Sequence, residues 1–112
     1  MILLQIYFDV SAEQCAAFER MYETIYAPAL RRQQGYQRST LLRLYPPRVS
    51  EEIEASPTEF NYQMELVFDS EENRRHWAAS DDHSVAFPQA QALARAVAWR
   101  GFDIAGSDSM AV

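Results

Sequence analysis

Residues 59–68, EFNYQMELVF, form the stretch that decides the fold. Every even-numbered position in it is large and apolar, while amide or carboxylate side chains fill three of the four positions between them. Because successive side chains of a β-strand point to opposite faces, this alternation predicts a strand with one apolar and one polar face. Such a strand suits an antiparallel sheet that helices cover on one face only. The apolar set is Phe60, Tyr62, Met64, Leu66 and Phe68, and the polar set is Asn61, Gln63 and Glu65.

Three further segments, residues 2–8, 36–45 and 96–105, are predicted as strands around this one. The first has isoleucine, leucine or phenylalanine at every even position, and the last alternates around large apolar residues. The second ends at two consecutive prolines, which have no N–H to donate to a neighbouring strand. The polar, proline-containing residues 48–59 then predict a long exposed loop before the central strand.

Helices are predicted between the strands. An amphipathic stripe runs from a cap at Asp9 or Ser11 to Gly35, and it kinks or restarts near Pro28 because proline interrupts helical hydrogen bonds. A pair of helices is expected after the central strand, broken and capped again at residues 80–82.

The resulting order of strand, helix, strand, strand, helix pair and strand is that of the ferredoxin-like α+β fold, βαββαβ, with a four-stranded antiparallel sheet. We expect residues 1–106 to form this single domain and residues 107–112 to be a flexible C-terminal tail. One face of the sheet would lack helices. The same face of a second copy could cover it, so we expect a homodimer that closes into an α/β barrel.

The composition argues against several classes of function. A net charge of −6 is unsuited to nucleic acid, whose phosphates require basic surfaces. All ten basic residues are arginine, so neither Schiff-base chemistry nor a P-loop lysine is available. The single cysteine allows no internal disulfide, and no apolar run approaches the roughly 20 residues that span a bilayer. We therefore expect a cytoplasmic protein that binds neither nucleic acid nor membrane.

The polar face of the central strand is the predicted ligand cleft, with Glu65 at its centre. Aromatic side chains mixed with a few polar groups are typical of small-molecule sites. The expected substrate-binding residues on this face are Gln5, Tyr7, Arg43, Gln63 and Trp99. A slip of one residue in the outer strands would replace Arg43 by Leu42 and Trp99 by Ala98. If Arg43 lies across from Glu65, the two would form an ion pair; the alternative is that Glu65 transfers protons.

Two histidines offer acid–base chemistry near neutral pH. His76 is the candidate catalytic partner of Glu65, with a surface or capping position on its helix as the alternative. His83 follows Asp81 and Asp82, an arrangement that acidic helix capping explains better than a metal site. With one cysteine and no H-x(3)-H spacing, no metal site is predicted.

Residues 18–36, FERMYETIYAPALRRQQGY, and residues 66–80, LVFDSEENRRHWAAS, resemble the dimeric α/β-barrel superfamily, nearest to its EthD-like and antibiotic-biosynthesis-monooxygenase-like members. The residues that carry this likeness are Phe18, Tyr22, Tyr26, Pro28, Leu30, Gly35 and Tyr36. The superfamily includes cofactor-independent oxygenases, cyclases, isomerases and haem-degrading proteins. Tyr26 stands where these proteins often have a histidine. Since a phenol is a poor general base at pH 7, we expect Tyr26 to donate a hydrogen bond in the cleft instead.

These observations predict a homodimer that binds a small organic ligand. The predicted activity is that of a cofactor-independent oxygenase or a proton-transfer enzyme, such as a cyclase or isomerase, acting on an aromatic or polyketide-like compound. No metal or organic cofactor is expected. A non-catalytic binding or assembly module with a filled dimer interface is the alternative. A haem-binding or haem-degrading protein is a weaker alternative, because His76 is its one sensible axial ligand and Gln5 replaces an asparagine of that branch.

Overall fold

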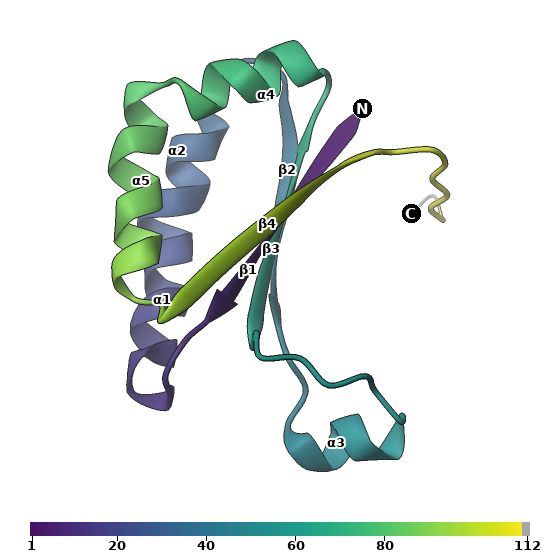
Figure 1. Cartoon of the computed structure of the whole chain (residues 1–112). Coiled ribbons are helices and arrows are strands. Elements are labelled where there is room, and N and C mark those ends of the chain that lie inside the picture. Colours follow the sequence, from purple (N-terminus) through teal and green to yellow (C-terminus); the bar gives the residue numbers. More distant parts are fainter. Residues whose placement is uncertain (111–112) are drawn as a thin grey trace.

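A four-stranded antiparallel sheet with helices packed on one face forms the framework of the protein (Figure 1). The computed structural model describes residues 1–110. The strands lie in the order β2-β3-β1-β4, so the two most apolar strands are central. Their bounds are Ile2–Asp9 for β1, Tyr36–Arg43 for β2, Tyr62–Phe68 for β3 and Ala96–Asp103 for β4. The predicted ferredoxin-like α+β fold is thereby confirmed.

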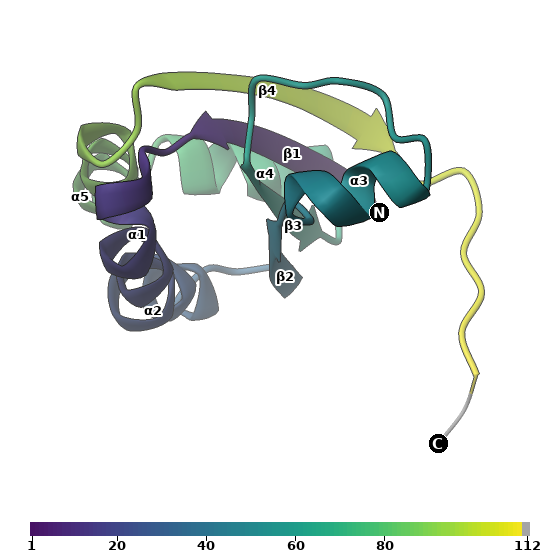
Figure 2. The same ribbon diagram turned by 90° about the horizontal axis from the view of Figure 1, so that it is seen from below.

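The helices lie in three groups along the chain. α1 (Cys15–Met21) and α2 (Ala27–Arg31) follow β1, α3 (Pro47–Glu52) follows β2, and α4 (Glu71–Ala78) and α5 (Asp81–Ala92) follow β3. α1, α2 and α5 lie together on one side of the sheet, whereas α3 stands apart from them in both views (Figures 1 and 2). Within residues 1–110 no helix is packed across the opposite side of the sheet, which we call the open face.

The core fills the space between the sheet and the helices. β1 and β3 contribute alternate side chains to it, and the helices add Phe18, Tyr26 and Trp77, each at most 1% exposed. The strand residues in the core are Ile6, Phe8, Tyr62, Met64, Leu66 and Phe68. Burial of one large apolar side chain stabilises a fold by about 1.5–3 kcal/mol. The alternation in β3 therefore decides which face of the sheet the helices cover.

The kink predicted near Pro28 is a π-helical turn at Tyr22–Tyr26, between α1 and α2. In this turn the N–H of Ala27 donates to the carbonyl of Tyr22, five residues earlier. Pro28 follows this turn directly, at the second residue of α2, so the residue without an N–H falls where the helical hydrogen-bond pattern already changes. The turn lets the apolar stripe continue along the core despite the proline.

Several predicted boundaries need correction. Residues 48–59 are not wholly a loop, because Pro47 begins α3. Proline has the backbone angle of a first helical residue, so it starts this helix as well as following a strand. Phe60, expected as the first core residue of the central strand, precedes β3 and packs its ring 5.8 Å from that of Tyr7. The two edge strands end at Arg43 and Asp103, each two residues earlier than expected.

The chain after β4 has no helix or strand through residue 110. Residues 111–112, the end of the predicted tail, lie outside the described residues. No helix in the described part of the chain is long and apolar enough to cross a membrane.

Candidate functional site

The middle of the open face consists of three rows of side chains that run across the strands. Beyond them, Asp9 of β1 pairs with Ala96 of β4 and forms an ion pair with Arg95. Strand register defines each row, because residues paired on neighbouring antiparallel strands point to the same side. The middle row is Thr40, Glu65, Gln5 and Arg100, in the order β2-β3-β1-β4. The rows beside it are Arg38, Val67, Leu3 and Phe102 on one side, and Leu42, Gln63, Tyr7 and Ala98 on the other.

A hydrogen-bonded chain links four residues that the sequence predicted for this face. The Tyr7 hydroxyl donates to Gln5 Oε1. Gln5 Nε2 donates to Glu65 Oε2 at 3.0 Å, and Gln63 Nε2 donates to the same oxygen at 2.9 Å. Two amide donors thus fix the orientation of the carboxylate. Among the described residues no hydrogen bond reaches the other oxygen, Oε1, which is free to accept a proton.

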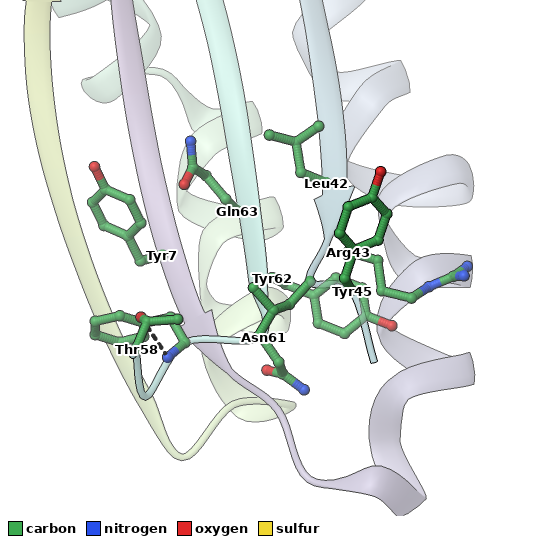
Figure 3. Close-up of a pocket in the computed structure, with 10 residues that line it drawn as sticks. Tyr7, Leu42, Arg43, Tyr45, Thr58, Asn61, Tyr62 and Gln63 are labelled. Atoms are coloured by element: carbon green, nitrogen blue, oxygen red, sulfur yellow. Dashed lines mark hydrogen bonds between the residues drawn. The ribbon is translucent and has the colours of Figure 1, made fainter. Parts of the chain in front are cut away.

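A cleft of about 610 Å³ lies at the end of the open face next to α3 (Figure 3). Tyr7, Gln63 and Leu42 line it from the sheet, and Tyr45 and Phe60 line it from the segments that flank α3. Its volume and its mixture of aromatic and amide groups are typical of small-molecule sites. Glu65 is not among the lining residues; Tyr7 and Gln63 connect the cleft to it.

Arg43 is not on the open face, and the expected ion pair with Glu65 is wrong. Arg43 is paired in register with Tyr62, so it shares the helix-covered side of the sheet. Its guanidinium donates to Glu19 of α1 through Nε at 2.8 Å and through Nη2 at 2.7 Å. The Tyr62 hydroxyl also donates to this carboxylate. Hydrogen bonds from Arg43 and Tyr62 lower the pKa of the Glu19 carboxyl.

Trp99 is also on the helix-covered side, contrary to expectation. It is paired in register with Ile6, and the centre of its ring lies 6.1 Å from the ring centre of Phe87 in α5. The slip of one residue considered above is the arrangement that the strands adopt, with Leu42 and Ala98 on the open face.

Tyr26 does not reach the cleft. Its ring is buried in the core, 5.9 Å from that of Trp77. Among the described residues its hydroxyl is buried with no hydrogen-bond partner. Burial raises the pKa of this phenol well above its usual range. Tyr26 is therefore a core residue, and the hydrogen bond expected from it is not made in the cleft.

The two histidines lie away from Glu65. His76 is exposed on α4, and its neighbour Trp77 is in the core. His83 is half-buried between Trp77 and Phe87, and this burial lowers the pKa of its imidazole. In residues 1–110 no three His, Cys, Asp or Glu side chains gather into a possible metal site.

Arg100 is the open-face residue that the sequence reasoning missed. A signal for it was present, because Val97 and Trp99 are apolar while Arg100 is charged. That pattern predicts that the odd-numbered side chains of β4 point toward the core. The expectation placed Trp99 on the open face, which corresponds to the opposite register.

Comparison with known proteins supports the fold. No family model matches the sequence, and no curated protein matches it. A mutant of SnoaB, a cofactor-independent oxygenase from Streptomyces nogalater, is similar in structure, with a TM-score of 0.72 and 20% identity over 95% of this chain and 94% of that one. An ethyl tert-butyl ether D (EthD) family protein from Bacillus halodurans C-125 has a TM-score of 0.65 and 18% identity over 92% and 98% of the two chains.

A candidate antibiotic biosynthesis monooxygenase from Deinococcus radiodurans is similar over 100% of this chain and 98% of its own, with a TM-score of 0.70 and 12% identity. These similarities confirm the predicted likeness to EthD-like and monooxygenase-like proteins. At such low identities they establish a shared fold.

Proposed function

We propose that the chain binds a planar aromatic or polyketide-like compound on the open face and removes a proton from it with Glu65, without a metal or organic cofactor. The observation that carries this proposal is the chain of hydrogen bonds from Tyr7 through Gln5 to Glu65. It fixes a carboxylate, leaves one of its oxygens free, and borders a cleft of about 610 Å³.

The proposed step is a general-base reaction. Glu65 Oε1 takes a proton from an acidic C–H or O–H group of the substrate, and the electron pair stays on the substrate as a delocalised enolate. Returning the proton at another atom completes an isomerisation. In a cyclisation the enolate carbon attacks a carbonyl carbon of the same molecule, and the proton goes to the oxygen of that carbonyl. Attack of the enolate on O₂, as co-reactant, begins an oxygenation. SnoaB, a cofactor-independent oxygenase of similar fold, supports the second outcome by analogy.

The other open-face residues would position the base and the substrate. Gln5 and Gln63 hold the Glu65 carboxylate by hydrogen bonds, and the aromatic ring of Tyr7 forms one wall of the cleft against which the substrate would lie. Arg43 also lines the cleft (Figure 3), but its guanidinium is bound to Glu19 of α1. It is therefore the less suitable cation for a ligand.

A second copy of the chain would cover the open face in this proposal. Leu42, Tyr45 and Phe102 are between 42% and 59% exposed. Exposed large apolar groups of this kind favour an interface, and a twofold axis would place the same face on both partners. A homodimer would exclude water from Glu65.

Anthrone, a planar compound with an acidic C–H, tests the catalytic step. Oxidation of anthrone by O₂ gives anthraquinone and one water, and both O₂ uptake and anthraquinone absorbance can be followed. We expect the wild type to accelerate this reaction and Glu65→Gln to lose at least about 100-fold in rate, the usual contribution of a general base. Glu72→Gln, which removes an exposed carboxylate from α4, is the matched control and should keep full activity.

A Glu65→Gln variant as active as the wild type would remove Glu65 from the mechanism. Binding of anthrone without any acceleration would favour the alternative of a binding module without catalysis. The observation that favours that alternative is the position of Glu65 beside the cleft and not in its lining.

A further inference from the structure

We infer that Arg100 binds an anionic group of the ligand, so that the open face selects aromatic compounds carrying a carboxylate or an ionised phenol. This inference rests on the proposed function, since it concerns the same face of the sheet. It adds the chemical class of the ligand and a residue that determines specificity.

The register of the strands sets the position of Arg100. Arg100 pairs with Gln5, and Gln5 pairs with Glu65, so all three side chains lie in the middle row of the open face. Two strand spacings of about 4.8 Å separate the backbones of Arg100 and Glu65 by roughly 10 Å. That span suits a ligand of two or three fused rings. One edge of the ligand would meet Glu65 and the other edge would meet the guanidinium.

The charges of the open face differ from those of the whole chain. The chain carries a net charge of −6, but the three rows hold two arginines, Arg38 and Arg100, against the single carboxylate of Glu65. A locally positive surface on an acidic protein attracts anions.

No group on the open face neutralises Arg100. Five other arginines form ion pairs with carboxylates, whereas no ion pair or side-chain hydrogen bond engages Arg100 among the described residues. Gln5, its neighbour in register, is already bound to Glu65 and Tyr7. The guanidinium is therefore available for a bidentate hydrogen bond to a carboxylate.

Apolar neighbours complete the surface around Arg100. Phe102 lies two residues further along β4 on the same face and is 46% exposed. Leu3 is its partner in register on β1. A flat ring system could pack on these two side chains while its anionic group reaches Arg100. Arg38 is in the row of Leu3 and Phe102 but at the opposite edge of the sheet, on β2.

Two probes of matched shape test the inference directly: anthracene-2-carboxylate and anthracene-2-methanol. Their dissociation constants are measured by titration of anthracene fluorescence at low salt. We expect the wild type to prefer the carboxylate. Arg100→Gln should weaken carboxylate binding by about tenfold, the loss of one charge-assisted contact, and change alcohol binding by less than twofold. Raising the salt concentration should weaken only carboxylate binding.

Two control variants distinguish a direct contact between Arg100 and the ligand from nonspecific attraction by the positive charges of the protein. Arg20→Gln removes an exposed arginine from α1, across the sheet, and should leave both dissociation constants unchanged. Arg38→Gln removes the other open-face cation and should have a much smaller effect than Arg100→Gln. Circular dichroism spectra and thermal midpoints that match the wild type will establish that each variant is folded.

Four results would overturn the inference. The first is that Arg100→Gln weakens binding of the alcohol as much as binding of the carboxylate. The second and third are that Arg20→Gln weakens carboxylate binding as much as Arg100→Gln does, or that Arg38→Gln weakens it more. The fourth is that the wild type binds neither probe. The catalytic proposal fails separately. If Glu65→Gln oxidises anthrone normally while Arg100→Gln still loses carboxylate binding, the role of Glu65 is wrong and that of Arg100 stands.

Discussion

Tyr26 places its whole aromatic ring in the core, beside Trp77. The π-helical turn at Tyr22–Tyr26 sets the direction of its side chain, and that direction is into the core. Tyr26 lies four residues after Tyr22 and eight after Phe18, so it continues the apolar stripe of the helix.

The buried hydroxyl of Tyr26 leads to a prediction about stability. Tyr26→Phe removes a polar atom that has no partner and keeps the ring that packs on Trp77. We expect the free energy of unfolding in urea to rise by about 1 kcal/mol, since an unpaired buried hydroxyl is destabilising. Tyr62→Phe is the matched control, and it should lower that free energy by about 1 kcal/mol because its hydroxyl is bound to Glu19. A less stable Tyr26→Phe protein would show that the hydroxyl does have a partner.

The face on which each candidate residue lies was predicted correctly on the central strands and wrongly on the edge strands. Gln5, Tyr7, Gln63 and Glu65 lie together because β1 and β3 alternate clearly between core and surface. The edge strands have weaker patterns. In β2 the inward position Ser39 is polar, bound to Tyr22 and Tyr36, and a bulge shifts the register between Tyr36 and Arg38. A bulge of this kind leaves no mark in the hydrophobic pattern.

At the scale of elements, the order of strands and helices was predictable but some ends were not. α3 was missed because two prolines indicate the end of a strand, and the same prolines also suit the start of a helix. The predicted helix caps had mixed outcomes. Ser80 accepts the N–H of His83 at the start of α5, as predicted for residues 80–82, and Ser70 caps α4 in the same way. Ser11, by contrast, makes no side-chain cap hydrogen bond.

Gly35 joins α2 to β2, and its position has no room for a side chain. Its φ angle is +80°, a conformation that side chains disfavour, and an added Cβ would lie 2.4 Å from Asn73 Nδ2 and 2.4 Å from Asp69 Oδ1. Gly35→Ala should therefore lower the free energy of unfolding by about 2 kcal/mol, part from backbone strain and part from displacing these side chains.

A second glycine supplies the control for this prediction. An added Cβ at Gly101 in β4 would meet nothing within 4 Å. Gly101→Ala should leave stability unchanged or raise it slightly, because alanine restricts the unfolded chain more than glycine does. Equal losses in the two variants, measured by urea unfolding, would contradict the role assigned to the positive φ angle of Gly35.

At the scale of the whole molecule, the fold followed from the order of elements and from the alternation in β3. The same alternation predicted that one face of the sheet has no helices on it. That face carries amides, a carboxylate and several large apolar groups, so we expected a second copy of the chain to cover it. The structure leaves that face without helices, while residues 1–110 pack all four strands against one helical layer on the other side. A second copy is the cover that we propose, and it would also enclose Glu65.

Dimerisation through the open face is tested with one variant on each side of the sheet. Leu42→Asp puts a charge on the open face, at a leucine that is 42% exposed, and Val85→Asp puts one on α5, at a valine that is 59% exposed. Sedimentation should give the wild type twice the 12.9 kDa mass of one chain. We expect Leu42→Asp to raise the dimer dissociation constant at least about tenfold, because a buried unpaired charge opposes association, and Val85→Asp to leave it unchanged. Thermal midpoints should rise with protein concentration for the dimeric forms only. A monomeric wild type, or equal dissociation of both variants, would contradict an interface on the open face.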